Sequence, residues 1–174
     1  MRKPLRQVAA LVAVGPWILS CSANPVGPVS ATLSTDTVSY LAVLGAPLGA
    51  GHEYSFSVIA TFTNRSANTV SLSRCTEATP YPIYGVEVVG HDTTSAFDPG
   101  WGCPAGLWYR VPAGATRVDT LPLRGPWGGD GVTGRAQGIF DGSFRLVYQL
   151  YGDGDVHDIV RSNKFSVSRA PQGR

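Results

Sequence analysis

Residues 53–64 alternate apolar and polar side chains, and this alternation constrains the fold more than any other feature of the chain. The apolar positions are Tyr54, Phe56, Val58, Ala60 and Phe62. The polar positions include Ser55, Ser57, Thr61 and Thr63. Side chains that repeat with a period of two and leave one face polar are typical of a β-strand that packs its other face on a core. We therefore expect a half-buried strand over residues 53–64.

The rest of the chain repeats this pattern in shorter segments. The alternating apolar positions in 144–151 are Phe144, Leu146, Tyr148 and Leu150. Further candidate strands cover 29–34, 37–43, 69–74, 83–89, 107–111, 116–123, 156–160 and 165–167. After residue 21 no window of a dozen residues shows helical periodicity, and 21 glycines and 13 prolines punctuate the chain. Eight or nine short strands with such turns predict an all-β domain over 29–168, folded as a single antiparallel sandwich of two sheets.

Two turn-rich segments predict how neighbouring strands connect. Asn-Arg-Ser-Ala-Asn at 64–68 links two candidate strands, and Gly-Asp-Gly-Asp at 152–155 links two more. Asn and Asp-Gly favour tight turns, so we expect a hairpin at each place. The carboxylates of Asp153, Asp155 and Asp158 leave a calcium site open as an alternative at the second turn. Because no EF-hand spacing follows, we predict a turn there and no metal site.

The first 21 residues are typical of an export signal. Arg2, Lys3 and Arg6 form a basic start, and an apolar run follows over 8–19. This run is shorter than the roughly 20 residues that a membrane-spanning helix needs, and it fits the apolar region of a signal peptide. The segment ends in Ile-Leu-Ser-Cys, which places a cysteine at Cys21.

This ending resembles the lipobox of bacterial lipoproteins, in which an aliphatic residue, a tolerant position and a small residue precede a cysteine. The resemblance implies that residues 1–20 are removed and that Cys21 becomes a lipidated N-terminus anchored in a membrane. Residues 21–28 then hold the lipidated cysteine and a short linker. Ser22 rather than Asp follows the cysteine, which by the family's sorting rule implies the outer membrane. An ordinary secretory signal cut near Ala23 is the alternative.

Charge argues against a nucleic-acid partner once the signal is set aside. The full chain has 14 Lys and Arg against 12 Asp and Glu. Removing Arg2, Lys3 and Arg6 leaves 11 bases against 12 acids, a net charge of −1. Proteins that bind nucleic acids usually concentrate basic residues on one face, and no basic run follows Arg6. The last residues, 169–174, are polar and are expected to form a disordered tail.

Three cysteines suit an exported, lipid-anchored protein. With Cys21 acylated, Cys75 and Cys103 remain as a pair, and an oxidising compartment favours a disulfide between them. A zinc site is the alternative, but two thiols without CxxC spacing give it little support. Because Cys75 ends a candidate strand and Cys103 lies in a predicted loop, the disulfide is expected to pin a loop rather than to bridge the two sheets.

The strand spacing resembles the immunoglobulin-like domains of bacterial envelope proteins, although the Cys–Trp–Cys arrangement of antibody domains is missing. A narrower set of residues comprises Asn64 and Ser66 after a long strand, the turn at Pro112 and Gly114, and the segment from Gly142. This set resembles the small β-sandwich family that includes the intracellular proteinase inhibitor of bacilli. The chain departs from that family by its export signal, its cysteine pair and the insert 125–141.

Two tryptophan-bearing segments are the candidate recognition sites. Residues 125–142 hold Trp127 among glycines, and residues 91–106 hold Trp101 beside Cys103. Exposed aromatic side chains dominate many binding surfaces, so Trp101 and Trp127 are the candidate contacts. The alternative is that Trp127 packs on a sheet and that Trp101, together with Trp108, caps the core; the core position is favoured for Trp101 and Trp108.

No catalytic signature accompanies these features. The histidines His52, His91 and His157 are scattered, and neither a GxSxG elbow nor an HExxH motif is present. We therefore expect a non-enzymatic envelope lipoprotein that acts as a binding or structural module and needs no cofactor. Its expected partners are the membrane, through Cys21, and an envelope protein or a glycan. A proteinase inhibitor is the alternative function.

Overall fold

The computed structural model describes residues 30–48, 51–90, 97, 103, 107–125, 142–152 and 155–171. Within these ranges every regular element is a β-strand, and there are ten. They are β1 (Ala31–Thr35), β2 (Ser39–Leu48), β3 (Gly51–Asn64), β4 (Val70–Arg74), β5 (Gly85–Val88), β6 (Leu107–Val111), β7 (Thr116–Gly125), β8 (Phe144–Gly152), β9 (Asp155–Arg161) and β10 (Ser166–Arg169).

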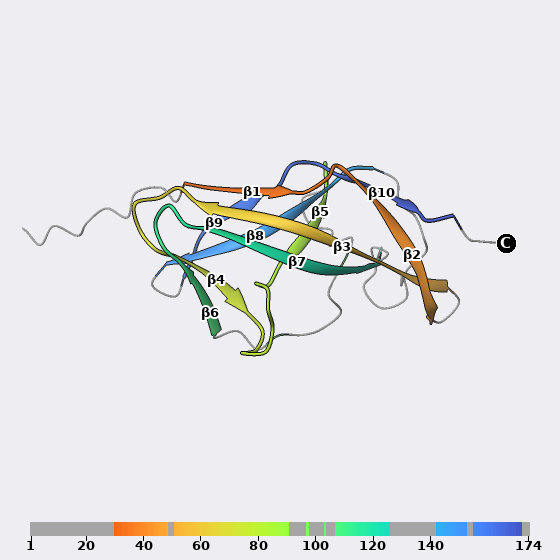
Figure 1. The fold of residues 1–174 in the computed structure, drawn as a ribbon, viewed down its shortest axis with the longest axis horizontal. Helices are drawn as coiled ribbons and strands as arrows, with labels where there is room; N and C mark the ends of the chain where they lie inside the picture. Colours follow the sequence, from red (N-terminus) through yellow and green to blue (C-terminus); the bar gives the residue numbers. More distant parts are fainter. Residues whose placement is uncertain are drawn as a thin grey trace, which may run out of the picture.

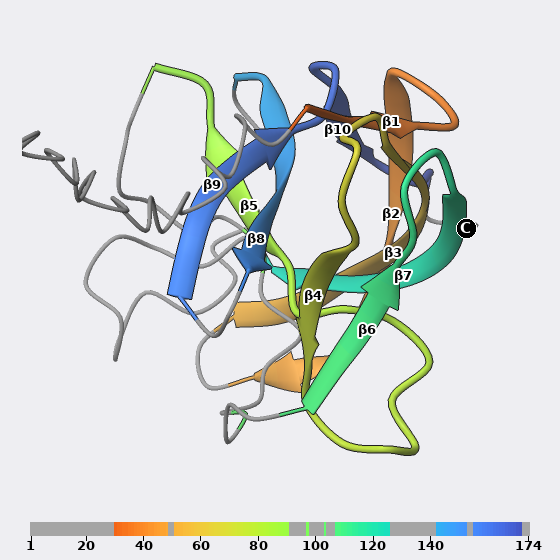
Figure 2. The same ribbon diagram turned by 90° about the vertical axis from the view of Figure 1, so that its left-hand side faces the viewer.

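The strands form two five-stranded sheets that enclose one core (Figures 1 and 2). Sheet 1 contains β1, β2, β3, β7 and β10, and sheet 2 contains β4, β5, β6, β8 and β9. The predicted all-β, two-sheet class is therefore confirmed, with ten strands in the described ranges rather than eight or nine. In those ranges no helix is long and apolar enough to cross a membrane.

Sheet 1 is built around the long strand β3. One edge of β3 pairs with β7 along its length, from Tyr54 to Thr63. The other edge is shared by two shorter strands in series, because β1 pairs with the end of β3 and β2 with its start. Between these two contacts β2 leaves β3, and its residues 39–42 pair with β10 instead. The β2–β10 pair is parallel, whereas the other strand pairs of the described ranges are antiparallel.

Sheet 2 repeats this arrangement around β8. One edge of β8 pairs with β9, which confirms the hairpin predicted at 152–155. The other edge is again shared by two short strands, β4 near Leu150 and β5 from Phe144 to Val147. β6 then pairs with the far edge of β4. The last strand of the described ranges, β10, ends at Arg169, one residue beyond the predicted end of the domain.

The hairpin predicted at 64–68 is wrong, because β3 and β4 belong to different sheets. The buried amide of Asn64 explains why the chain crosses there. Its Nδ2 donates hydrogen bonds to the carbonyl oxygens of Asn68, Val111 and Pro112, at 2.8, 2.9 and 3.1 Å. Its Oδ1 accepts from both the backbone N–H and the hydroxyl of Ser66. The crossing from β3 to β4 is thereby tied to the crossing from β6 to β7.

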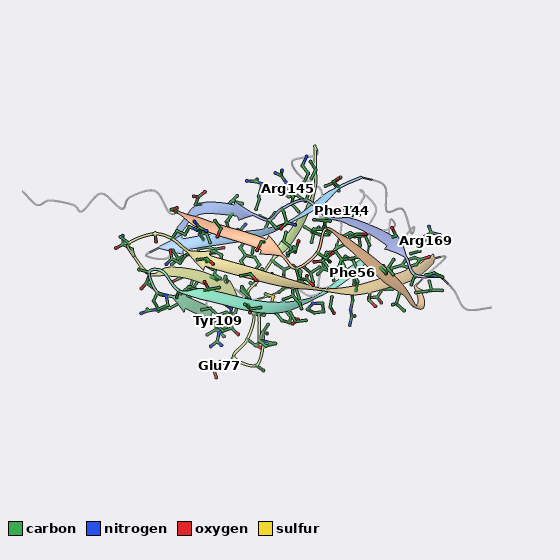
Figure 3. The ribbon with its side chains drawn as sticks, turned by 45° about the horizontal axis from the view of Figure 1, so that its top comes forward. Phe56, Glu77, Tyr109, Phe144, Arg145 and Arg169 are labelled. Carbon is green, nitrogen blue, oxygen red and sulfur yellow. A yellow bond between two sulfur atoms is a disulfide. The ribbon has the colours of Figure 1, made fainter. Side chains whose placement is uncertain are left out.

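The core lies between the sheets and is filled by the inward-facing positions of the alternating strands. The aromatic side chains pack edge to face in its centre, where Phe97 contacts both Phe56 and Phe144 with ring centres 5.1 Å apart. Figure 3 labels Phe56 and Phe144 among the side chains that fill this space. The fully buried side chains include Val58, Phe62, Leu121, Leu123, Leu146 and Tyr148. The period of two read from the sequence therefore assigns the buried face of β3 and β8 correctly.

Replacing Asn64 with Asp keeps the shape of the side chain but removes its donor group. We expect Asn64→Asp to lower the free energy of unfolding by about 3 kcal/mol, because the carbonyls of Asn68, Val111 and Pro112 lose their donor. Urea denaturation measures the change through the midpoint at an unchanged slope. Asn68→Asp is the matched control, since the Asn68 side chain is exposed. Equal stability of the two variants would contradict the role assigned to Asn64.

Candidate functional site

The predicted cysteine pair comes together at one end of sheet 2. Cys75 directly follows β4, Cys103 precedes β6, and the two are joined by a disulfide with their Cα atoms 4.9 Å apart. Because β4 and β6 are neighbours, with Arg74 opposite Leu107, the disulfide fastens the segment before β6 to the end of β4. It lies within one sheet and does not bridge the two.

The other predicted site residues lie outside the described ranges. This applies to Cys21, Trp101 and Trp127 and to His91, and the side chains of His52 and His157 are also not described. In the segment 91–106 the two described residues are both held, since Phe97 is fully buried and Cys103 is in the disulfide. Among the described residues no three His, Cys, Asp or Glu side chains lie close enough to hold a metal ion.

Trp108 is not in the core, contrary to the favoured expectation. It lies on the outer face of sheet 2, directly opposite Ser73, and its ring packs on that of Tyr151 with centres 4.7 Å apart. The cause is the small size of Ser71 and Ser73 on β4, the strand between β6 and β8. Because serines occupy the outer face of β4, the large rings of the two flanking strands meet across it.

A hollow opens beside this aromatic pair, at the junction where the partner of β8 changes from β4 to β5. Its volume is about 180 Å³. It is lined by Ser73, Ile83, Tyr84, Gly85, Val147, Gln149 and Tyr151. Gly85 lies opposite Val147, and a Cβ atom at residue 85 would meet nothing within 4 Å. The hollow therefore exists because the residue at the start of β5 has no side chain.

The groups that line this hollow are neutral. The hydroxyl of Tyr151 donates a 2.7 Å hydrogen bond to Oε1 of Gln149, which leaves the amide nitrogen of Gln149 as a donor. The hydroxyl of Ser73 has no hydrogen-bond partner among the described residues. Charged side chains border the hollow without lining it: Arg161, opposite Val147 on β9, forms a two-pronged ion pair with Glu87 at 2.7 and 3.0 Å. The hollow thus offers hydroxyl, amide and aromatic groups without a net charge.

The wall formed by residues 83–85 is fixed from both sides. The N–H of Ile83 donates to the carbonyl oxygen of Ser73 at 2.7 Å, which extends the pairing of β4. The hydroxyl of Tyr84 donates to the carbonyl oxygen of Pro122 on β7, in the opposite sheet. Because these bonds reach both sheets, the hollow is preformed, as small-molecule sites usually are.

A partly buried ion pair links Arg117 and Asp119 on β7. Nε of Arg117 donates to Oδ2 of Asp119 at 2.8 Å, and the guanidinium stacks on the ring of Tyr109 at 3.7 Å. Burial raises the pKa of Asp119, and the contact with Arg117 opposes this. The hydroxyl of Tyr109 in turn donates a hydrogen bond to the carbonyl oxygen of Thr79. The loop that follows β4, which carries Glu77 (Figure 3), is held to sheet 1 in this way.

A second, wider hollow lies on the outer face of sheet 1, where β2 leaves β3. It has a volume of about 660 Å³ and is lined by Tyr40, Leu41, Val43, Gly45, Glu53, Ser55, Phe56, Ser57, Pro122, Leu123 and Arg124. Asp36 fixes Tyr40, one of the lining residues, because Oδ1 of Asp36 accepts from the Tyr40 hydroxyl at 2.6 Å and from the N–H of Ile59 at 3.1 Å. Partial burial raises the pKa of Asp36, but these hydrogen bonds outweigh it and the pKa is lowered.

The two hollows differ in chemistry. The hollow in sheet 1 is bordered by the ion pair of Glu53 and Arg124 and by aliphatic side chains, of which Leu41 and Val43 are about 60% exposed. The hollow in sheet 2 combines an aromatic pair with neutral hydrogen-bonding groups. Trp and Tyr beside a few polar groups are the usual composition of recognition sites. We therefore take the outer face of sheet 2 around Trp108 and Tyr151, called the aromatic face below, as the candidate functional site.

Sequence reasoning missed the aromatic face for an identifiable reason. The strand Leu107–Val111 is apolar at four of its five positions, so alternation does not say which side chains face outward. The signal that was available is the pair of serines in β4, Ser71 and Ser73, which alternate with Val70 and Leu72. Reading these serines as the outer face requires knowing that β4 and β6 are neighbours.

Comparison with known proteins adds no further constraint: neither a family model nor a curated protein matches the chain. The interpretation of the site therefore depends on its geometry.

The disulfide gives a direct test of how the end of sheet 2 is held. Replacing both Cys75 and Cys103 with Ser is expected to lower the free energy of unfolding by about 3–4 kcal/mol, because the open chain gains entropy when it unfolds. Guanidinium denaturation of the oxidised protein and of the double variant measures this difference. Thiol labelling of the unreduced, unfolded protein should find neither Cys75 nor Cys103 free, and reaction of both thiols would contradict the pairing.

Proposed function

We propose that this chain is a non-enzymatic, lipid-anchored module of the bacterial envelope that binds its partner through the aromatic face. The observation that carries the proposal is the contact between Trp108 and Tyr151 on the outside of sheet 2, beside a preformed hollow. Half-buried aromatic side chains beside a preformed hollow are typical of binding surfaces, where Trp and Tyr provide much of the contact energy.

The rigidity of the surroundings supports a binding role. The aromatic face lies on three adjacent strands, and the residues of its rim are fixed by bonds to Ser73 and to Pro122. A preformed surface loses little conformational entropy when it binds. Its neutral groups provide stacking and hydrogen bonding, which are the interactions of recognition rather than of acid–base chemistry.

The lipid anchor is supported by the sequence at 18–21. If Cys21 is acylated, residues 22–30 connect the anchor to the start of β1. A chain of this length extends at most about 30 Å, so the aromatic face would operate close to the membrane. Anchoring at this distance favours ligands that belong to the envelope.

The anchor has a direct test in cells. Cys21→Ala is expected to leave the precursor unacylated and uncleaved by the lipoprotein pathway, because the thiol that receives the lipid is gone. Metabolic labelling with a fatty acid and partition into detergent measure the change. Ser22→Ala is the control and should be labelled like the native chain. Labelling of the Cys21→Ala protein at the native level would contradict the anchor.

The aromatic face has a test that does not depend on knowing the ligand. In-cell cross-linking of a tagged chain, followed by mass spectrometry, identifies what co-purifies with it. We expect Trp108→Ala to reduce the main cross-linked product at least fivefold, because the larger ring of the aromatic pair is lost. Val118→Ala is the control, since Val118 is 62% exposed on the outer face of sheet 1.

Circular dichroism of the purified variants separates loss of binding from loss of folding. If Trp108→Ala folds and retains the cross-linked product, the aromatic face is not the binding site. If the main product is a protease bound at equal stoichiometry and left inactive, the inhibitor alternative replaces this proposal.

A further inference from the structure

We propose that the hollow of the aromatic face binds one ring of a neutral saccharide. This inference deepens the proposed function and depends on it, because it uses the same surface. The volume of the hollow, about 180 Å³, is below the range of roughly 300–1,000 Å³ that drug-sized ligands occupy. It therefore accepts a single ring-sized group, with the rest of a longer ligand lying along the outer face of sheet 2.

The polarity of the hollow matches that of a sugar ring. A pyranose has apolar C–H faces and a rim of hydroxyl groups. The aromatic ring of Tyr151 and the aliphatic side chains of Ile83 and Val147 provide apolar contact surface. The amide of Gln149 and the hydroxyl of Ser73 provide hydrogen bonds that a ring hydroxyl can both donate and accept. Trp108, packed on Tyr151, extends the aromatic surface beyond the hollow for a second ring.

The absence of charge among the residues that line the hollow selects against ionic ligands. None of the described residues that form it carries a charged group, and desolvation of a charged ligand there would be uncompensated. The nearest carboxylate on β5, that of Glu87, is already paired with Arg161. Phosphorylated, sialylated and uronic acid ligands are therefore disfavoured relative to neutral sugars.

The pairing of β8 leaves no edge of that strand for an extended peptide. Peptides that bind to sheets usually do so by adding a strand at a free edge. At the hollow both edges of β8 are already paired, because Val147 lies opposite Gly85 on one side and Arg161 on the other. Side-chain contact and hydrogen bonding from above the sheet remain, and these are the interactions that a saccharide uses.

Gly85→Val gives a sharp test, because it fills the hollow without disturbing the strand. A Cβ atom at residue 85 meets nothing within 4 Å, and the backbone there is not in the left-handed region. Valine favours β-strands, and replacing glycine also restricts the unfolded chain. The variant is therefore expected to be at least as stable as the native protein. Ser57→Val is the matched control, because it adds an aliphatic group to an exposed strand position on the outer face of sheet 1.

The experiment uses the mature full-length chain in detergent. An array of neutral oligosaccharides built from glucose, galactose, mannose and N-acetylglucosamine identifies the preferred sugar, and calorimetric titration measures its affinity. We expect saturable binding by the native protein and by Ser57→Val, and binding at least tenfold weaker for Gly85→Val. No binding to any neutral sugar, a preference for acidic sugars, or equal affinity for Gly85→Val would each overturn the inference.

Cross-linking of the same two variants in cells distinguishes this failure from failure of the proposed function. If no neutral sugar binds but Gly85→Val still loses the cross-linked product that Ser57→Val retains, the aromatic face is a binding site for another class of ligand. If neither sugar binding nor the cross-linked product depends on Gly85 or Trp108, both proposals fail.

Discussion

The structure depends on how the backbone hydrogen bonds of two long strands are satisfied. β3 and β8 run through the centres of the two sheets, and each has two edges of N–H and C=O groups that need partners. One edge of each is covered by a single strand, β7 or β9. The other edge is covered by two short strands in series, β1 and β2 for β3, and β4 and β5 for β8. This shared constraint gives the two sheets the same plan.

The plan also determines where the surface is hollowed. A partner strand that ends or departs midway leaves a gap beside the central strand. The size of the side chains that border the gap determines whether it remains open as a hollow. In sheet 2 the gap is bordered by Ser73 and Gly85, whose small size leaves open space. In sheet 1 the departure of β2 toward β10 leaves a broader opening above Tyr40 and Phe56. Both hollows thus follow from strand pairing rather than from loops.

Long-range polar contacts keep the two sheets in register around these gaps. The amide of Asn64 joins the two crossings at one end of the sandwich, and the hydroxyl of Tyr84 reaches from sheet 2 to Pro122 in sheet 1. Arg117 and Asp119 connect β7 to Tyr109 and to the loop after β4. Because buried polar groups are costly unless they are paired, these contacts favour one arrangement of the sheets over others.

The sequence by itself determined the all-β class, the approximate positions of the strands and the buried faces of β3 and β8. It did so because the period of two is a local property, set by the geometry of a single strand. It also identified the pairing of Cys75 with Cys103 by elimination. Apart from the β8–β9 hairpin, the sequence did not determine which strands are neighbours, because that depends on contacts between distant residues.

Two errors show this limit. The turn at 64–68 has the composition of a hairpin, but only the carbonyls of Val111 and Pro112, brought to Asn64 by the fold, direct the chain into the other sheet. Trp108 lies in a strand that is apolar on both faces, and only the neighbouring serines of β4 place its ring on the outside against Tyr151. Tertiary structure alone decided the aromatic face, because its residues come from three strands that are far apart in the sequence and meet only when sheet 2 is assembled.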